Sequence, residues 1–227
     1  MNQVCIEVTG ERALFADPII SAGGEKISYE VPVYEALKGL LKNIYWKPTF
    51  LWVIDKVRVM NPIMMESVGI KLPRYNDSSS DLSYYTYLVN VKYQILAHME
   101  WNINRPEYNN DRDQGKHFTI FKDSVAKGGR YPIFLGKSEC KADVSMTHFG
   151  NGEGFYDHAG KYYLGFMYHG LTYADEAYND VTKDSLSLRF SNLEMVDGVI
   201  KYPRPEACVT RKIRKDEIKR WVEEGGE

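Results

Sequence analysis

The sequence has few cysteines and no long apolar run. Its three cysteines, Cys5, Cys140 and Cys208, lie far apart and form no CxxC pair, which is typical of buried thiols in a reducing compartment rather than of a disulfide framework. The longest apolar run, at 50–54, is far too short to span a membrane. Glu7, Glu11 and Arg12 also interrupt the first N-terminal candidate for a signal peptide. These absences predict a soluble, cytoplasmic protein with no membrane segment.

The sequence also lacks a strong net charge. It contains 29 basic and 31 acidic residues, a balance of -2, which excludes a generically basic nucleic-acid coat. The charge is unevenly distributed, however. Residues 112–141 carry seven basic and three acidic side chains, residues 153–197 carry three and eight, and residues 211–220 carry six and two. If the chain binds a polyanion, residues 112–141 are the first place to look.

Motifs for metals and dinucleotides are missing. The histidines at 98, 148, 158 and 169 do not have a ligand spacing such as HxxxH, so no metal site is predicted. The glycines of 150–154 spell GxGxG but do not stand between a strand and a helix. No cofactor is expected. The 227 residues, 44% of them hydrophobic, fit one domain or one domain with a smaller appendage.

Hydrophobic periodicity predicts alternating strands and helices over the first two thirds of the chain. Strands are expected near 4–8, 50–60, 85–101 and 133–144, with an irregular stretch at 61–83 whose tip is 77–80. One helix is expected to run from Pro32, in its first position, to Ile44, and another over 117–125, ended by Gly128 and Gly129. The order β-α-β-β-α-β is that of the ferredoxin-like fold, an α+β class.

The pattern changes after Gly150. Short strands are expected at 162–169, 185–190 and 199–202, the last two joined by Asp197 and Gly198. A basic amphipathic helix is expected at about 214–224. We therefore predict two parts: a ferredoxin-like, RNA-processing domain at 1–148, and a small antiparallel β extension with a basic C-terminal helix or tail at 149–227.

The expected topology brings distant residues together. Neighbouring strands are antiparallel in this fold, so the first helix ends where the second begins. Tyr45 lies at the first of these places, and Gly115, Lys116 and His117 lie at the second. A helix start offers unpaired N–H groups and a partial positive charge, and a glycine lets a ligand approach the backbone.

These three side chains suit a reaction of RNA. A 2′-hydroxyl attacks its own phosphate if its proton is removed, if charge on the phosphorane is stabilised and if the leaving oxygen is protonated. Histidine exchanges protons near neutrality, lysine stabilises an oxyanion, and tyrosine orients a hydroxyl or stacks on a base. No metal is needed. Taken residue by residue, Lys116 and His117 also fit an ordinary surface pair, and Tyr45 fits a core aromatic.

Several segments together resemble the type I-C (Dvulg) Cas-five family of CRISPR-associated proteins. The resemblance runs from about residue 4 to residue 208 and is specific in combination rather than in any single motif. The segments read ALFADP at 13–18, GGEK at 23–26, ALKG at 36–39, IYWKP at 44–48, GKH at 115–117, IFLG at 133–136 with EC at 139–140, GFYD at 154–157 and YPRP at 202–205.

The resemblance implies an RRM-related domain with a small β extension. It implies a metal-independent endoribonuclease that cuts the repeat hairpin of precursor CRISPR RNA, leaves a 2′,3′-cyclic phosphate and stays on the 5′ handle as a Cascade subunit in antiviral defence. The family's catalytic tyrosine corresponds to Tyr45, and its lysine and histidine correspond to Lys116 and His117. Which of Tyr45 and His117 is the general base is left open. The segment 61–83 resembles a thumb-like insertion that grips guide RNA and a neighbouring subunit.

The expected partners are the repeat RNA hairpin with its 5′ handle, and the backbone and large subunits of the type I-C complex; a contact with target DNA within that complex is open. Two other functions are also open. One is a non-catalytic subunit that binds the handle, and the other is a metal-dependent DNase that uses the acidic loop of Asp111 and Asp113. Further RNA contacts are predicted for basic side chains, namely Lys26, Lys47, Arg58, Arg112, Lys122, Arg130 and Lys137.

Overall fold

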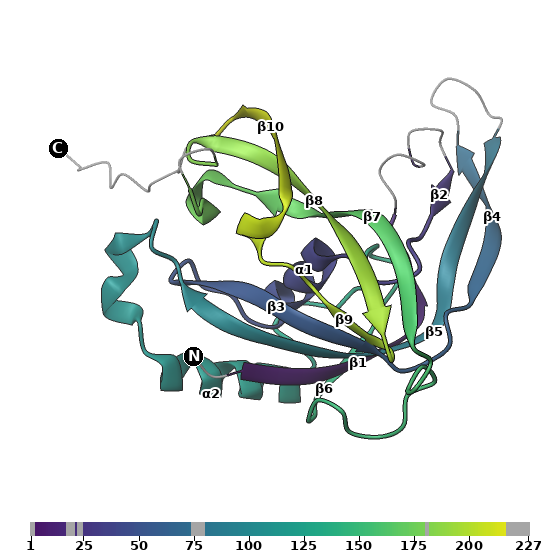
Figure 1. Ribbon diagram of the computed structural model, residues 1–227, viewed down its shortest axis with the longest axis horizontal. Helices are drawn as coiled ribbons and strands as arrows, with labels where there is room; N and C mark the ends of the chain where they lie inside the picture. The colour runs from purple at the N-terminus through teal and green to yellow at the C-terminus, as the bar shows by residue number, and fades with distance from the viewer. Residues whose placement is uncertain (1–2, 17–20, 22–24, 74–79, 180–181, 217–227) are drawn as a thin grey trace.

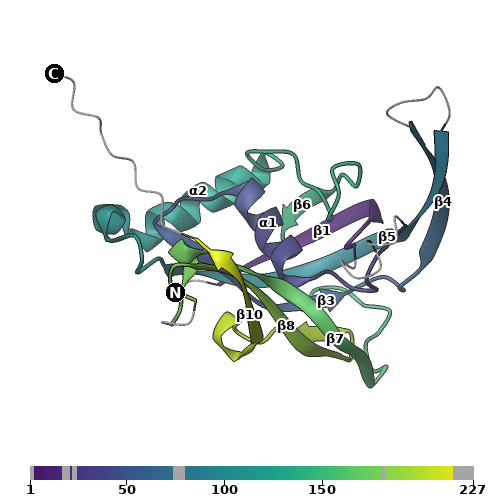
Figure 2. The same ribbon diagram turned by 90° about the horizontal axis from the view of Figure 1, so that it is seen from above.

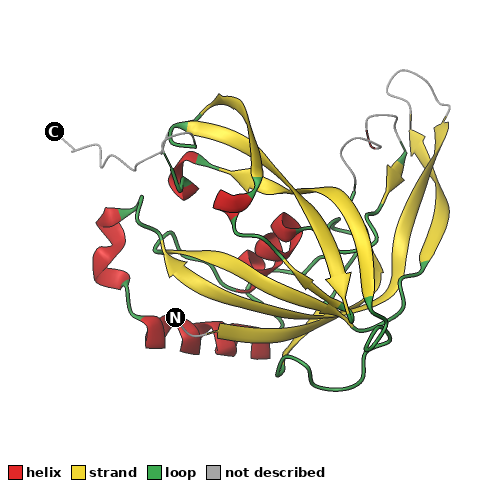
Figure 3. Cartoon of the chain, in the orientation of Figure 1, coloured by secondary structure: helices red, strands yellow, loops and turns green. Residues whose placement is uncertain are grey.

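Strands dominate the protein, and helices are few (Figure 3). The computed structural model describes residues 3–16, 21, 25–73, 80–179 and 182–216. The predicted turn at Gly23 and Gly24, most of the predicted tip at 77–80 and most of the predicted C-terminal helix lie outside these residues. The architecture is mixed α/β with a mostly antiparallel sheet.

The first part of the chain contains two α-helices and most of the sheet. Its strands are β1 (Gln3–Ala13), β2 (Lys26–Ile27), β3 (Phe50–Val59), β4 (Met65–Pro73), β5 (Ser80–Trp101) and β6 (Asp143–Met146). Its helices are α1 (Tyr34–Ile44), the 3-10 turn η2 (Pro106–Asp111) and α2 (Gln114–Ala126). The strand order is β3-β5-β1-β6, and every neighbour in it is antiparallel.

Both α-helices pack on the same face of this sheet. On β3, the ring of Trp52 lies 4.9 Å from that of Phe121 in α2, and Tyr34 of α1 accepts the N–H of Ile54 at 3.4 Å. Figure 2 shows α1 and α2 beside each other. α1 runs against the direction of β1, and α2 runs against that of β5. The last turn of α1 is hydrogen-bonded to residues 130 and 131, which follow α2, and the Tyr45 side chain just past α1 reaches His117 at the start of α2. The buried apolar stripe of α1 consists of Leu37, Leu40, Leu41 and Ile44.

The last part of the chain extends the sheet beyond β3. It comprises β7 (Lys161–Thr172), η3 (Ala174–Glu176), β8 (Ser185–Val196), β9 (Val199–Lys201), η4 (Pro205–Ala207) and β10 (Val209–Lys215). β9 pairs with β3, β8 with both β9 and β10, and β7 with β8. Asp197 and Gly198 form the predicted turn between β8 and β9, both with positive φ. The inner side of β7 covers α1, where His169 stacks on Tyr34.

Residues 65–73 and 80–83 belong to strands, contrary to the prediction of an irregular stretch at 61–83. β4 pairs with the first half of β5 from Met65↔Leu88 to Pro73↔Ser80, and this hairpin projects away from the rest of the molecule (Figure 1). Most side chains of β4 are exposed, so neither face of the strand needs an apolar row. The alternation by which a half-buried strand is recognised is therefore absent.

Three other element boundaries differ from the prediction. The first helix begins at Tyr34, with Val33 as its N-cap, so Pro32 precedes the helix. The strand expected at 133–144 is a packed loop with one bridge, Phe134↔Lys141, and only 143–146 pair with β1. The positions at the start of the predicted C-terminal helix, 214–215, belong to β10, because they pair with Leu186 and Ser185 of β8.

Candidate active site

Tyr45 directly follows the last residue of α1. Its backbone is extended, with φ −161° and ψ 128°, so consecutive side chains point to opposite sides. The Tyr45 ring is fully buried, whereas Trp46 is 44% exposed. Trp52 of β3 donates its indole N–H to the carbonyl of Tyr45 at 2.8 Å. The phenol is thereby held inside the molecule, against the sheet.

His117 lies in the first turn of α2. Asp113 caps this helix, since its carboxylate accepts the backbone N–H of Lys116 at 3.0 Å. The imidazole is fully buried, and its centroid lies 5.2 Å from that of Phe50 and 5.9 Å from that of Trp101. The start of α2 thus holds a proton-exchanging group in an aromatic environment.

Tyr45 and His117 form a direct hydrogen bond. The phenol oxygen lies 2.6 Å from Nδ1 of His117, and Nε2 of the same ring lies 2.7 Å from the backbone carbonyl of Asp111. A carbonyl only accepts, so in the neutral imidazole Nε2 carries the proton and Nδ1 is the acceptor. The phenol of Tyr45 therefore donates to Nδ1. The geometry is that of a proton-sharing pair.

Asp111 links Lys116 to this pair. Its carboxylate accepts from Nζ of Lys116 at 2.5 Å and from the hydroxyl of Thr49 at 2.8 Å, and its Oδ2 lies 3.6 Å from Nε2 of His117. The Lys116 side chain is half exposed. The half-exposed ammonium and the buried imidazole thus both lie beside the Asp111 carboxylate.

Burial and charge shift two of these groups. Burial raises the pKa of Tyr45, the Arg130 guanidinium opposes that shift, and the Asp111 carboxylate adds to it. Hydrogen bonds from Lys116 and Thr49 lower the pKa of Asp111. At neutral pH the phenol is therefore protonated and the carboxylate is charged.

The three residues predicted as catalytic meet at one end of the molecule, 70 residues apart in sequence. Asp111 and Thr49 belong to the same group, and sequence reasoning did not assign them to it. The sequence groups Asp111 with Asp113 in one acidic loop, but the two carboxylates act separately: Asp111 accepts from Lys116 Nζ, and Asp113 caps the helix. Only the short distance from Asp111 to Lys116 along the chain could have suggested the contact.

The seven basic residues predicted to bind RNA do not form one surface. Lys47, Lys122 and Arg130 are exposed near the ends of α1 and α2, and the Arg130 guanidinium lies 4.5 Å above the Tyr45 ring. Arg112 is half-buried and donates to the carbonyl of Asn102 at 2.9 Å. Of these four, Arg130 contacts the catalytic candidates directly, through the Tyr45 ring.

The other three lie elsewhere. Lys26 and Lys137 lie by the base of the β4–β5 hairpin, where the Lys26 ammonium is 4.7 Å above the Tyr85 ring. Arg58 is only 6% exposed. Its guanidinium donates to Asp157, to Gln94 and to the carbonyls of residues 151 and 152. It anchors a loop and faces no solvent, so a phosphate cannot reach it in this conformation.

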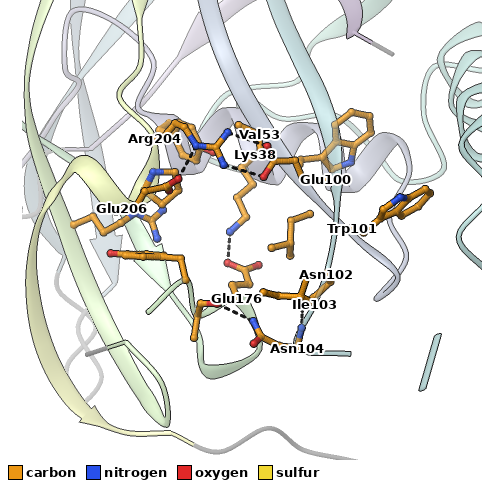
Figure 4. Close-up of a pocket in the computed structure, with 17 residues that line it drawn as sticks. Lys38, Val53, Glu100, Trp101, Asn102, Ile103, Asn104, Glu176, Arg204 and Glu206 are labelled. Carbon is orange, nitrogen blue, oxygen red and sulfur yellow. Dashed lines mark hydrogen bonds and ion pairs between the residues drawn. The ribbon is translucent and has the colours of Figure 1, made fainter. Parts of the chain in front are cut away.

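A separate cavity of about 230 Å³ lies between α1, the ends of β3 and β5, and the extension (Figure 4). Lys38 reaches across it to Glu176, and Arg204 pairs with Glu100 at 2.8 Å. Each cation that lines it has an acidic partner among the described residues. The cations of the cavity are therefore already neutralised by carboxylates, and neither Tyr45 nor His117 lines it.

Two features are absent from the described part of the chain. No three His, Cys, Asp or Glu side chains there are grouped so that they could hold a metal ion. No helix among those residues has the length and apolar character needed to cross a membrane.

Comparison with known proteins identifies the family. The family model Cas_Cas5d, described as CRISPR-associated protein (Cas_Cas5), matches residues 4–203. The chain belongs to the Cas5d family. Two solved structures share its fold and much of its sequence. A CRISPR-associated protein is 29% identical with a TM-score of 0.74, covering 92% of this chain and 96% of that one. A functionally uncharacterized protein from Streptococcus mutans is 33% identical with a TM-score of 0.75, covering 92% and 97%.

Two curated Cas5d proteins are also similar, and both are named CRISPR pre-crRNA endoribonuclease Cas5d. The protein from Mannheimia succiniciproducens is 31% identical over 149 residues, which is 56% of this chain and 64% of that protein. The protein from Thermus thermophilus is 37% identical over 154 residues, which is 64% of each. The chain spans about 64% of the length of these Cas5d relatives.

Proposed function

We propose that this Cas5d family member is a metal-independent endoribonuclease that cuts the repeat hairpin of precursor CRISPR RNA. The observation that carries the proposal is the 2.6 Å contact between Tyr45 and His117, with the Lys116 ammonium at the same edge of the molecule. The two relatives named pre-crRNA endoribonuclease support the substrate. After cleavage the protein stays on the 5′ handle, within a complex that also contains backbone and large subunits.

The reaction is an attack by a 2′-oxygen on the adjacent phosphorus. The 2′-hydroxyl loses its proton, the bond from phosphorus to the 5′-oxygen breaks, and that oxygen takes up a proton, which leaves a 2′,3′-cyclic phosphate. Lys116 stabilises the charge on the non-bridging oxygens. Tyr45 and His117 exchange the protons. Because Tyr45 is protonated at rest, it acts as a base only after passing its proton to His117; as an acid it donates directly.

The substrate must open the site before it reacts, because both Tyr45 and His117 are fully buried. Two groups cover them: the Arg130 guanidinium above the phenol ring, and the Asp111 backbone at Nε2 of His117. Asp111 lies beside Lys116, and Arg130 lies beside the end of α1. RNA phosphates would bind at both places. Catalytic hydrogen bonds commonly align only in the substrate complex.

We also propose the ferredoxin-like fold for residues 1–148 and a β extension for residues 149–227. The strand order β6-β1-β5-β3, with both helices on one face, supports the first part. A cytoplasmic location is part of the same proposal, supported by free cysteines at 5, 140 and 208. Burial raises the pKa of each thiol to about 11, so the thiols remain protonated and unreactive.

The test is cleavage of the repeat RNA by the purified protein in EDTA, with the 3′ end of the product identified. We expect a 2′,3′-cyclic phosphate and no product when the nucleotide at the cut carries a 2′-deoxy sugar. Lys116→Ala should abolish most of the rate while Lys127→Ala, at the other end of α2, keeps it. Cleavage of the 2′-deoxy RNA would refute the proposed chemistry.

A second candidate is a non-catalytic subunit that binds the 5′ handle. The complete burial of Tyr45 and His117 favours it, since a buried hydrogen bond between two helices is also a structural element. This function predicts tight binding of the hairpin with no product at any pH from about 6 to 9, a range that brackets the pKa of imidazole. Product formation that depends on His117 excludes it.

A further inference from the structure

A hollow opens on the surface immediately beside the buried Tyr45. It has a volume of about 430 Å³ and is lined by Lys42, Asn43, Trp46, Arg130 and Tyr131. We call it the Trp46–Tyr131 hollow. It lies where the end of α1 meets the segment that follows α2, and no carboxylate lines it.

The walls of the hollow are fixed by hydrogen bonds. Arg130 and Tyr131 donate their backbone N–H groups to the carbonyls of Ile44 and Asn43, at 3.3 and 3.0 Å, and the Asn43 amide donates to the carbonyl of Pro132 at 3.2 Å. Carbonyls in the last turn of a helix have no partner within it, so the loop after α2 caps α1. The hollow is therefore formed before any ligand binds, which lowers the entropic cost of binding.

The hollow combines aromatic surface with positive charge. Trp46 is 44% exposed and Tyr131 is 66% exposed, although large aromatic side chains are usually buried in stable proteins. Lys42 is engaged by Glu176 at 2.9 Å, whereas the exposed Arg130 has no acidic partner among the described residues and lies against the Tyr45 ring. Aromatic faces beside a cation are the means by which proteins bind single-stranded nucleic acid.

We propose that the Trp46–Tyr131 hollow binds one unpaired base of the RNA next to the scissile phosphate, with Arg130 contacting an adjacent phosphate. The inference rests on the proposed function, because it adds a binding subsite to that reaction. Arg130 both lines the hollow and lies over the Tyr45 ring, so a base held on Trp46 and a phosphate near Tyr45 belong to neighbouring nucleotides. Moving Arg130 from the Tyr45 ring to a phosphate would also uncover the phenol. The hollow thus determines which phosphodiester is cut.

The test uses a set of repeat RNAs, each lacking the base of one nucleotide near the cut and each blocked there by a 2′-deoxy sugar. The dissociation constant of each RNA is measured with the wild type and with Trp46→Ala. The wild type should lose about 5- to 150-fold in affinity at one position, as expected for one lost base stack. Trp46→Ala should bind the intact RNA equally weakly and lose nothing more at that position.

Two further variants control the measurement. Trp46→Phe keeps an aromatic face and should restore most of the affinity and the sensitivity at the same position. Tyr163→Ala removes an aromatic of β7 that is 74% exposed, and it should leave the whole profile unchanged. Because the RNAs are blocked at the cut, the result does not depend on catalysis. Failure of the proposed function is measured separately: the unblocked repeat RNA would then bind to the wild type and remain uncleaved.

Three outcomes would overturn the inference. In one, no abasic position weakens binding to the wild type. In another, Trp46→Ala keeps the sensitivity of the wild type. In the third, Trp46→Ala binds every RNA normally but no longer assembles with purified subunits of the complex. The last result would assign the hollow to a protein partner instead of a base.

Discussion

Replacing Tyr45 by Phe removes one oxygen atom from the centre of the candidate site. The ring keeps its volume, so no cavity forms, and the lost interaction is the 2.6 Å hydrogen bond to Nδ1 of His117. Since both groups are fully buried, Nδ1 is left without a partner, which costs about 1–3 kcal/mol of unfolding free energy. For a chain of this length, this corresponds to a fall in Tm of about 2–12 °C.

The same substitution should affect catalysis more strongly than stability. A side chain that transfers a proton in the transition state contributes about 10²–10⁴-fold to the rate, which is about 2.7–5.5 kcal/mol of barrier. We expect Tyr45→Phe to bind the repeat RNA normally and to lose this factor in single-turnover cleavage. The measurements are urea unfolding for stability and a pre-steady-state time course with enzyme in excess for the rate.

A matched control separates the two effects. The buried phenol of Tyr202 donates to the carbonyl of Pro32, far along the chain from the candidate site. Tyr202→Phe should lose a similar amount of stability and keep the cleavage rate. If Tyr45→Phe is destabilised as expected but cleaves like the control, the Tyr45–His117 bond is structural and the proton-transfer role is wrong. If its stability is unchanged, the hydrogen bond itself is absent in solution.

Three other substitutions test separate parts of the structure. Asp111→Asn should lower KM for the repeat RNA, because it removes a carboxylate that competes with phosphate for Lys116. It should leave kcat near the wild-type value, because the phosphate holds the ammonium in the substrate complex. An unchanged KM in steady-state kinetics would contradict this. The hydrogen bond from Arg204 lowers the pKa of Glu100 from 4.5 to about 2. Because the pKa is lower in the folded state than in the unfolded state, the ionised Glu100 stabilises the fold. This contribution is complete above pH 4.5 and is lost as the pH falls towards 2. Glu100→Gln should flatten that part of a stability–pH curve measured by urea unfolding, and an unchanged slope would exclude the pair as its source. Gly136→Ala should destabilise strongly, because φ is +90° and the added Cβ would overlap a backbone carbonyl; a normal melting temperature would contradict it.

The buried elements could be predicted from the sequence because burial leaves a pattern. The apolar spacing in α1 and the alternation in β5 gave the correct type of element. Gly128 and Gly129, both with positive φ, end the region of α2 as expected. The exposed β4 and β10 could not be predicted in this way, because a strand whose two faces both meet solvent needs no alternation. At 133–135 the apolar residues fill the core from a loop, and periodicity does not distinguish such a loop from a strand.

The meeting of Tyr45 and His117 was predictable for a different reason. The order of elements places both helices on one face of the sheet, and the Tyr45 side chain reaches the start of α2 across that face. Their burial was not predictable, because it depends on side chains from Phe50, Trp101 and the loop before α2. The sequence pattern could not exclude Arg58 as an RNA ligand either, since a buried and an exposed arginine look alike until their partners in a distant loop are known.

The role of Asp111 links burial to function. In the free protein its carboxylate neutralises Lys116, and its backbone carbonyl accepts a hydrogen bond from Nε2 of His117. One residue therefore holds both the charge and the imidazole in place. In the proposed function, an RNA phosphate is an anion that competes for the same ammonium. When it replaces the carboxylate, the loop before α2 loses its contact with Lys116 and the cover over His117 is weakened. Substrate binding and exposure of the buried pair are then one event, which explains how a site closed to water could still act on a phosphodiester.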